Sequence, residues 1–412
     1  MAVLPMQYRP TEAVVDLDAL RANYEAFRLH LHRSTLLLAC VKANAYGHGA
    51  VEVSRELERL GADYLSVAFL DEALELRHGG ITLPILVLGY TPPEGLAVAR
   101  EHDITVALFS DEVLEAARDL EHSSSGCRLK VHVKVDSGMG RLGRMAGTDA
   151  VSFAKKAIEA DTIEVEGLFT HFARADEVDK AYTLTQYEAF RNVVDALVRE
   201  GIDIPLIHTG NSAAAIDMPG LSPKMVRIGI ALYGLYPSCE VNHAVVALKP
   251  VLTLKTRAVF VKTLQEPMGI SYGSLYTAEA GERIATLPIG YADGYSRMLG
   301  GKAEVLVRGQ RVPVTGTICM DQCMVSLKSF ADAEDILAGE EVVLLGSQSG
   351  ASITADEIAH KLGTIHYEVV CMLAHRIPRI YARKGMIIAN SNPLLNARPT
   401  GFYDFSEPIV KK

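Results

Sequence analysis

The strongest candidate for chemistry in this chain is a lysine that stands at the end of an apolar run. Lys42 follows LLLACV at 36–41 and precedes ANAYGHG, which contains Tyr46. The run predicts a short buried strand and the glycines predict a tight loop, so Lys42 should leave the sheet where the loop begins. Partial burial favours the neutral, nucleophilic amine, which can form a Schiff base with an aldehyde cofactor. A lone lysine at a strand end more often only snorkels to solvent, so the interpretation depends on its neighbours.

Three further basic residues occupy informative places. Lys134 lies near the end of LKVHVKV at 129–135, and Arg141 follows in the glycine-flanked loop DSGMGRLG. An arginine there can hold a carboxylate through two hydrogen bonds, although a surface ion pair is the alternative. Arg227 lies inside the apolar run MVRIGIALYG and cannot shed its proton, so it needs a buried acceptor. That acceptor is either a core carboxylate or a ring nitrogen of a bound cofactor.

Polar residues also follow other predicted strands. His171 comes after GLFT, and Asn211 and Ser212 come after PLIHTG. Ser212 opens a helical run, and the first amides of a helix are unpaired donors that suit an anion. The alternative is that Asn211 or Ser212 only caps that helix. The backbone amides of Gly229 and Ile230, next to Arg227, could approach a phosphate.

A second group of candidates lies in glycine-rich loops of the C-terminal half. Tyr272 occurs in GISYGSLY, Tyr291 in GYADGYSR, and Met320 and Asp321 in TICMDQCM. Such loops expose a tyrosine to a ligand or a partner. Taken singly, each tyrosine is equally well explained as a turn residue whose hydroxyl satisfies a neighbouring loop.

The elements that must position these residues alternate regularly through the first half of the chain. Eight apolar runs are separated by amphipathic stretches, which predicts a (β/α)₈ TIM-type barrel with its chemistry at the carboxyl ends of the strands. The runs begin at Leu36, Tyr64, Pro84, Ile104, Leu129, Val165, Pro205 and Met225.

After Pro237 the pattern becomes alternating and rich in β-formers, which predicts a mainly antiparallel β domain. We therefore divide this α/β chain into a barrel at 11–245 that would bind the cofactor, a mainly β domain at 246–385, and a tail at 386–412. Residues 1–10 are expected to pack on the β domain. The tail shows no long periodic element, so we expect a loosely attached arm.

The composition restricts the classes of molecule that this protein is expected to bind. The 412 residues are 49% hydrophobic with a net charge of −9, which argues against nucleic acid and anionic membranes and favours a small metabolite. No apolar run is long enough for a membrane span and no export signal is visible, so we expect a cytoplasmic protein. The six cysteines resemble reduced thiols, and Cys319 and Cys323 lack a second pair of ligands, so no metal is expected.

Taken together and in order, the blocks VKANAYGHG, VDSGMGRLG, THFA, HTGNSAA, RIGIALYG, SYG, LPIGYADGY and ICMDQ resemble the alanine racemases, pyridoxal-phosphate enzymes with a barrel and a β domain. The resemblance covers about residues 10–385. It implies a homodimer with shared active sites that racemises alanine by two-base proton transfer, either supplying D-alanine for peptidoglycan or serving alanine catabolism.

The resemblance also implies a role for each block. Lys42 would hold pyridoxal phosphate as a Schiff base and act as one base, and Tyr272 of the partner subunit would be the second base. Tyr46, Asn211, Ser212, Gly229 and Ile230 would hold the phosphate, and Arg227, supported by His171, would donate to the ring nitrogen. Arg141 would contact both the cofactor and the substrate carboxylate, and Lys134, which many family members carry as a carbamate, would orient Arg141. Met320 would contact the substrate, with Tyr291 and Asp321 in supporting positions.

One departure bears on specificity. His375 in CMLAHRIPRI stands where many family members have a tyrosine, which the resemblance places between the phosphate and the substrate pocket. A serine or broader small-amino-acid racemase is therefore an alternative.

A decarboxylase of basic amino acids is a second alternative, against which Arg227 counts, because such enzymes usually offer a carboxylate to the ring nitrogen. A non-catalytic pyridoxal-phosphate barrel is a third, against which the β domain with SYG and CMDQ counts.

Overall fold

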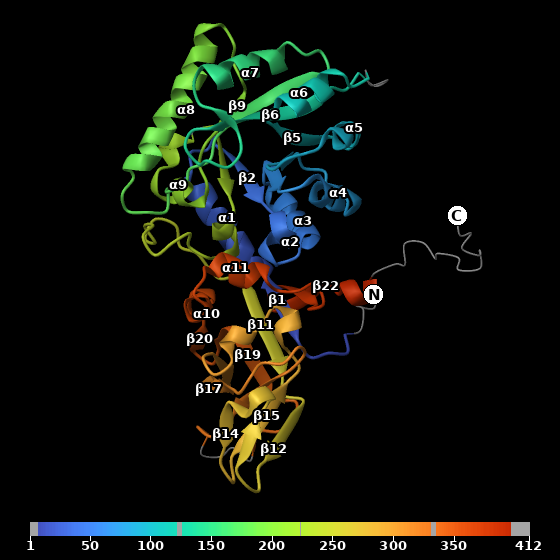
Figure 1. Ribbon diagram of the computed structural model, residues 1–412, viewed down its shortest axis with the longest axis vertical. Helices are drawn as coiled ribbons and strands as arrows, with labels where there is room; N and C mark the ends of the chain where they lie inside the picture. The colour runs from blue at the N-terminus through green and yellow to red at the C-terminus, as the bar shows by residue number, and fades with distance from the viewer. Residues whose placement is uncertain (1–6, 122–125, 223, 331–334, 397–412) are drawn as a thin grey trace, which may run out of the picture.

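The computed structural model describes residues 7–121, 126–222, 224–330 and 335–396. It consists of two units stacked along the long axis of the molecule, a barrel surrounded by helices and an elongated β unit (Figure 1). Among the described helices, none combines the length and the apolar character that crossing a bilayer requires.

Within the described residues, eight parallel strands close a ring, as predicted. The order is β5-β4-β3-β2-β10-β9-β8-β6, and pairing of β5 with β6 completes it. Alternate side chains of these strands point into the barrel, and most are fully buried. The strands are β2 (Leu36–Cys40), β3 (Tyr64–Val67), β4 (Ile85–Val87), β5 (Ile104–Leu108), β6 (Leu129–Asp136), β8 (Ile163–Phe169), β9 (Leu206–His208) and β10 (Met225–Ile228).

Helices cover the barrel because each presents an apolar stripe to the strands. In α3, for example, Val53 and Leu57 are four residues apart and fully buried, and Gly61 ends the helix in a left-handed conformation. The helices are α1 (Leu17–His30), α2 (Lys42–Tyr46), α3 (Ala50–Leu60), α4 (Leu70–His78), α5 (Leu96–Glu101), α6 (Asp111–Arg118), α7 (Thr148–Ile158), α8 (Ala181–Arg199) and α9 (Ser212–Asp217); η1 (Pro93–Gly95), η2 (Pro219–Leu221), η3 (Ile230–Tyr233) and the short strand β7 (Arg144–Met145) complete the unit.

The second unit is mainly antiparallel β structure, as expected from the alternation after Pro237. Its strands are β11 (Leu252–Arg257), β12 (Phe260–Thr263), β13 (Met268–Ile270), β14 (Tyr276–Ala278), β15 (Arg283–Leu287), β16 (Glu304–Val307), β17 (Gln310–Thr315), β18 (Cys323–Ser326), β19 (Glu341–Gln348), β20 (Ala351–Ile353) and β21 (Arg379–Arg383). The short helices are η4 (Tyr272–Ser274), η5 (Tyr291–Asp293), η6 (Arg297–Leu299), α10 (Ala355–Leu362) and α11 (His366–Cys371).

The N-terminal strand belongs to this second unit, which corrects the predicted start of the barrel at residue 11. Strand β1 (Glu12–Asp16) pairs with β11 and β21, far away in sequence. Asp16 then caps α1 by accepting from the amides of Asp18 and Ala19, so the chain passes directly from the β sheet to the barrel. Before β1, Arg9 pairs with the buried Asp293 at 2.7 Å, which holds the described part of residues 1–10 on the β unit.

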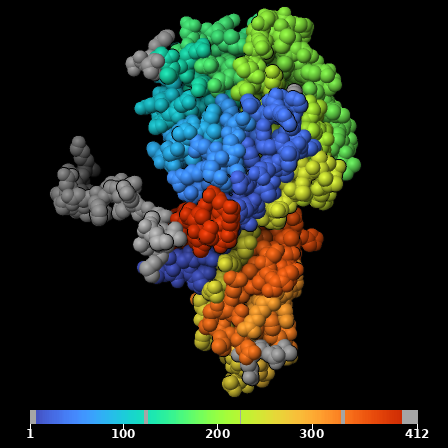
Figure 2. Space-filling model, turned by 180° about the vertical axis from the view of Figure 1, so that it is seen from behind, coloured from blue at the N-terminus to red at the C-terminus, as the bar shows by residue number. Residues whose placement is uncertain are grey.

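The predicted tail also starts too early. Strand β22 (Met386–Ser391) pairs with β21 and is followed by α12 (Pro393–Asn396). Its apolar residues are largely exposed, so backbone pairing rather than side-chain burial holds it, and hydrophobic periodicity could not reveal it. The rest of the tail, 397–412, lies outside the described residues. Figure 2 shows the last described residues, in red, lying across the waist beside the barrel, where Arg383 pairs with Glu56.

Candidate active site

The segment that follows Lys42 has an unusual backbone. Lys42 leaves β2 at the mouth of the barrel, and Ala43, Asn44, Ala45 and Tyr46 all have positive φ between 51° and 54°. Left-handed conformation is costly for residues with a side chain, so the surroundings must hold it. Two side chains do so: Glu72 accepts from the amide of Ala43 at 2.6 Å, and Asn44 accepts from the amide of Ala50 at 2.8 Å.

Tyr46, Ser212 and Gly229 meet at one place on the barrel rim. Ser212 accepts a hydrogen bond from the amide of Gly229 at 2.9 Å. A Cβ on Gly229 would lie 2.5 Å from the Tyr46 hydroxyl, so only glycine fits under that ring. Ile230 follows and opens η3. Asn211 caps α9 by accepting from the amide of Ala214 at 3.1 Å, as the capping alternative proposed.

Arg227 is buried in the barrel without a carboxylate partner among the described residues. It donates to Nδ1 of His208 at 2.7 Å and of His171 at 3.1 Å, and to the carbonyls of Thr170 and Thr209, both at 2.8 Å. Burial is the largest influence on the guanidinium and lowers its pKa to about 10, so Arg227 is still a cation at neutral pH. These uncharged acceptors exclude the first acceptor considered for it, a core carboxylate.

The histidines beside Arg227 are neutral and their tautomers are determined. Because Arg227 donates to Nδ1 of His208, Nε2 of His208 carries the proton and donates to Nδ1 of His132 at 2.8 Å. Burial first, and then the charge of Arg227, hold the pKa of His208 well below its usual range and lower that of His132 to about 3. The sequence analysis did not single out His132, although the polar residues at alternate positions of LKVHVKVD indicate a shared face toward the barrel interior.

The pKa of His171 is affected by several positive charges of the site. Its pKa is lowered well below the usual range, first by desolvation and then by the positive charges of Arg227, Arg141, Lys42 and Lys134. The structure therefore gathers, around one imidazole, four basic residues that come from three separate segments of the sequence. Such a cluster favours an anionic ligand, because a bound anion lowers the mutual repulsion of the cations.

Lys134 and Arg141 are positioned by the strand end of β6. Lys134 is buried, and burial with the charges of Arg141, Arg227 and Lys42 lowers its pKa to about 8, against a smaller opposite effect of Asp136. Asp136 accepts from the amides of Gly138, Met139, Gly140 and Arg141, which shapes the loop. Burial would raise the pKa of Asp136, but these donors lower it on balance. Arg141 is exposed, so its side chain is accessible to a ligand.

The candidates of the β unit form a separate, exposed surface. Tyr272 is 73% exposed, Met320 53% and Tyr291 41%. Hydrogen bonds join their loops: Thr317 donates to the carbonyl of Tyr272 at 2.8 Å, and the amide of Ala292 donates to the carbonyl of Met320 at 3.0 Å. Asp321 adds an ion pair with Arg376 to this surface.

Tyr272 and Lys42 are not brought together within one chain. Tyr272 opens η4, just before β14 of the β unit, whereas Lys42 opens α2 in the barrel (Figure 1). The two candidate bases therefore lie on different units of the same molecule.

The segment before β21 contains the specificity candidate His375 and a tyrosine that the sequence motifs did not single out. His375 is exposed in the turn before β21, whereas Tyr367 of α11 packs against Tyr46 with 6.4 Å between ring centroids. Sequence reasoning missed Tyr367 because contact between α11 and α2 brings together segments more than 300 residues apart. The role of His375 in substrate specificity therefore stays a prediction.

The buried neutral histidines predict that acid destabilises the fold. The pKa of His132 is lowered to about 3 and that of His48 to about 4, in both cases mainly by burial. In an unfolded chain an imidazole titrates near ~6.5, so the stabilisation from each is complete above that pH and is lost as pH falls toward 4, by up to about 3 kcal/mol per group. Urea unfolding between pH 7 and pH 4.5 should show the loss.

Two substitutions control this measurement. His132→Asn keeps an acceptor for His208 and should make stability less dependent on pH, whereas His32→Asn at an exposed position should not change the dependence. A pH dependence that is the same in His132→Asn and the unaltered protein would contradict the assignment.

Comparison with known proteins agrees with this architecture. Residues 15–237 match the family model described as alanine racemase, N-terminal domain, and residues 251–381 match alanine racemase, C-terminal domain. Among curated proteins, alanine racemase 2 of Bacillus subtilis (strain 168) is 46% identical over 92% of this chain and 97% of its own length. Alanine racemase of Clostridium perfringens (strain SM101 / Type A) is 43% identical over 93% and 98%.

Solved structures agree as well. Alanine racemase of Clostridium difficile 630 superposes with a TM-score of 0.89 at 41% identity, over 94% of this chain and 100% of its own. A structure of alanine racemase from Bacillus anthracis with bound L-Ala-P gives 0.89 at 40% identity, over 95% and 100%.

The fold and the site define an enzyme class: a (β/α)₈ barrel joined to a β domain, with a lysine and three further cations at the barrel mouth. The matches cover both units at sequence identities between 40% and 46%, which are high enough to establish common ancestry. The chain belongs to the alanine racemase family.

Proposed function

We propose that this protein interconverts L- and D-alanine, with pyridoxal phosphate bound at Lys42 and with two proton-transferring groups, Lys42 and the partner subunit's Tyr272. The observation that carries the proposal is the convergence of Lys42, Lys134, Arg141 and Arg227 around His171. A cofactor phosphate and a substrate carboxylate are the anions that such a site would neutralise.

The residues present fit the cofactor. Gly229 leaves room beneath the Tyr46 hydroxyl, and Ser212 lies beside the Gly229 amide, so these groups with Ile230 would hold the phosphate. Arg227 is a buried cation whose acceptors among the described residues are uncharged, so it would donate to the ring nitrogen. When bound, pyridoxal phosphate withdraws electrons from the α carbon of an amino acid and acidifies its C–H bond.

The two proposed bases must act from opposite faces. Racemisation removes the α proton on one face and delivers a proton on the other, so Nζ of Lys42 and Oη of Tyr272 take alternate roles. Arg141 would hold the substrate carboxylate and thereby fix which face each base meets. Arg227 remains protonated and does not transfer its proton to the ring, which limits how far charge spreads onto the cofactor and favours return of the proton to the α carbon.

A homodimer completes this site. Tyr272, Met320 and Tyr291 are exposed in the single chain and belong to the β unit, whereas Lys42 belongs to the barrel. Exposure of a base and of apolar side chains on one surface is explained if that surface covers the barrel mouth of the partner. Tyr291 and Asp321 would then support Tyr272 and Met320 through the hydrogen bonds between their loops.

A racemase assay tests the proposed activity directly. Purified protein with pyridoxal phosphate should convert each enantiomer of alanine into the other, measured by chiral chromatography, and should convert serine more slowly. Equal turnover of serine would contradict the preference for alanine. Binding of pyridoxal phosphate without any racemisation would favour a non-catalytic carrier instead.

Lys134 is expected to carry a carbamate. A neutral amine reacts with carbon dioxide to give a carbamate anion and a proton, and a pKa of about 8 leaves much of Lys134 neutral at pH 8. The new anion would lie among Lys42, Arg141 and Arg227, which stabilise it. In ¹³C-bicarbonate, a carbamate NMR signal should be stronger at pH 8 than at pH 6.5 and absent in Lys134→Gln. A signal of equal size in Lys134→Gln would assign it elsewhere.

A further inference from the structure

The turn that carries Tyr272 has a backbone that few residues with a side chain adopt. Ser271 has φ 65° and ψ −176°, and Gly273 and Ser274, on the other side of Tyr272, have φ of 76° and 47°. The conformation of Ser271 is essentially restricted to glycine, and it persists in other residues only when the surroundings impose it. The side chain of Tyr272 is 73% exposed, so the backbone of this turn sets the direction in which the ring leaves the chain.

Thr317 holds this turn at two points. Its Oγ1 donates to the carbonyl of Tyr272 at 2.8 Å, and its own carbonyl accepts from Oγ of Ser271 at 2.5 Å. Thr317 is buried, so water competes little for either bond. The residue before it is Gly316, where a Cβ would lie 2.6 Å from the carbonyl oxygen of Ile270. Only glycine therefore lets the two segments approach this closely.

The hydroxyl of Ser271 explains how a serine can occupy a conformation that suits glycine. Its hydrogen bond to Thr317 offsets the cost that the side chain imposes on the backbone. The same hydroxyl lies 3.3 Å from Sγ of Cys319, so the segment 317–319 contacts it twice. The amide of Ser274 then closes the turn by donating to the carbonyl of Ser271 at 3.1 Å. These contacts fix the backbone on both sides of Tyr272.

A proton-transferring group must meet its substrate atom within a narrow range of positions, because a displacement of about 1 Å can cost about 100-fold in rate. We propose that Thr317 is a positioning residue: together with Ser271 it forms a clamp that fixes the direction of the Tyr272 phenol. The role of the phenol in this inference rests on the proposed racemase activity, whereas the clamp itself does not.

Substitutions of Thr317 separate the hydroxyl from the shape of the side chain. Thr317→Val keeps the volume and removes the donor, whereas Thr317→Ser keeps the donor. In the holoenzyme, Thr317→Val should lower kcat/KM for racemisation by between about 10-fold and about 100-fold, and Thr317→Ser by no more than about threefold. In deuterium oxide, Thr317→Val should slow exchange of the α hydrogen for the enantiomer that Tyr272 deprotonates and leave exchange of the other enantiomer unchanged.

Fluorine NMR measures the placement of the ring independently of activity. In holoenzyme made with 3-fluorotyrosine, the signal that is absent from Tyr272→Phe belongs to Tyr272. This signal should move or split in Thr317→Val and keep its position in Thr317→Ser. Ser271→Ala should disturb it more than Ser271→Gly, because alanine keeps the strained Cβ and loses the hydrogen bond, whereas glycine adopts this conformation freely.

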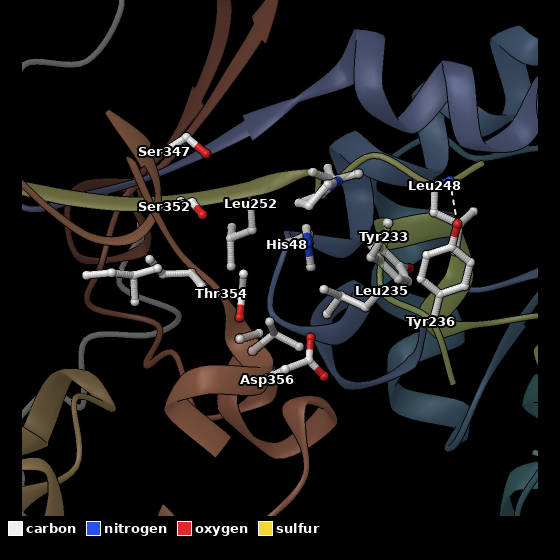
Figure 3. Close-up of a pocket in the computed structure, with 18 of the residues that line it drawn as sticks. His48, Tyr233, Leu235, Tyr236, Leu248, Leu252, Ser347, Ser352, Thr354 and Asp356 are labelled. Atoms are coloured by element: carbon white, nitrogen blue, oxygen red, sulfur yellow. Dashed lines mark hydrogen bonds between the residues drawn. The ribbon is translucent and has the colours of Figure 1, made fainter. Parts of the chain in front are cut away.

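Thr354→Val is the matched control, because it removes a threonine hydroxyl from another place in the β unit. Thr354 lies in the wall of a cavity between the barrel and the β unit, and it accepts from the amide of Glu357 at 3.1 Å as the cap of α10 (Figure 3). This variant should lower the Tm, yet leave the Tyr272 signal and the exchange of both enantiomers unaltered.

Three results would overturn the proposal: equal effects of Thr317→Val and Thr317→Ser, a Tyr272 signal that Thr317→Val leaves unchanged, or equal loss of exchange for both enantiomers. The proposed function can fail separately. A protein that racemises nothing, but in which Thr317→Val moves the Tyr272 signal and Thr317→Ser does not, would contradict the racemase activity and support the clamp.

Discussion

Replacement of Lys42 by alanine is expected to lower kcat/KM for racemisation of alanine by at least about 10⁴-fold, as is typical when a group that forms a covalent intermediate is removed. The variant should also lose the covalent link to pyridoxal phosphate. Lys42 emerges from β2 into a strained left-handed turn that Glu72 and Asn44 hold, so its amine is fixed at the barrel mouth. Neither Lys134 nor Arg141 is expected to replace it, because their backbones are fixed at the end of another strand.

Chemical labelling checks the same assignment. Borohydride reduction of the unaltered protein should fix the cofactor to one peptide, and mass spectrometry should place it on Lys42. Lys130→Ala is a matched control, since Lys130 lies on a barrel strand but forms an ion pair with Asp103 at 2.8 Å. Cofactor found on any other lysine, or a Lys42→Ala variant that retains activity, would contradict the assignment.

Replacement of Tyr272 by phenylalanine should lower racemisation in both directions by about 10³-fold, within the range of a lost general base. One enantiomer should still exchange its α hydrogen with solvent, because Lys42 can remove and return a proton on its own face. NMR in deuterium oxide measures this exchange for each enantiomer. Tyr276→Phe is the control and should keep most of the activity, because Tyr276 lies in β14 and its hydroxyl donates to Glu282 at 2.6 Å. Exchange of both enantiomers at unaltered rates would exclude Tyr272 as a base.

Mixing the two inactive variants tests whether sites are shared between subunits. In a heterodimer of Lys42→Ala and Tyr272→Phe chains, one site would contain both an intact lysine and an intact tyrosine. Random exchange of subunits at equal amounts should therefore restore about a quarter of the unaltered activity. No recovery after verified subunit exchange would place both bases of a site within one chain, which the separation of the two units disfavours.

Local sequence predicted the barrel well because each strand is buried on both faces and reads as a continuous apolar run. All eight predicted runs became strands of the ring. The same reasoning failed for β1, because its partners β11 and β21 are distant in the chain. It also failed for β22, which forms a hairpin with β21 but leaves its apolar side chains largely exposed.

Some residues of the candidate site could likewise be predicted from the sequence, and others could not. Motif spacing identified the basic residues, because a lysine or arginine after an apolar strand is unusual and chemically demanding. It could not identify Tyr367 or His132, whose importance lies in their contacts with Tyr46 and His208, two side chains remote in the chain.

The sequence by itself determined which side chains can carry chemistry and that eight strands bring several of them to one rim. Only the tertiary structure decided which of them meet: the cations around His171, the neutral acceptors of Arg227, and the placement of Tyr272 on the other unit. The physical reason is that residue type and periodicity are local properties, whereas desolvation, charge interaction and hydrogen bonding depend on distances between segments that the chain brings together only when it folds.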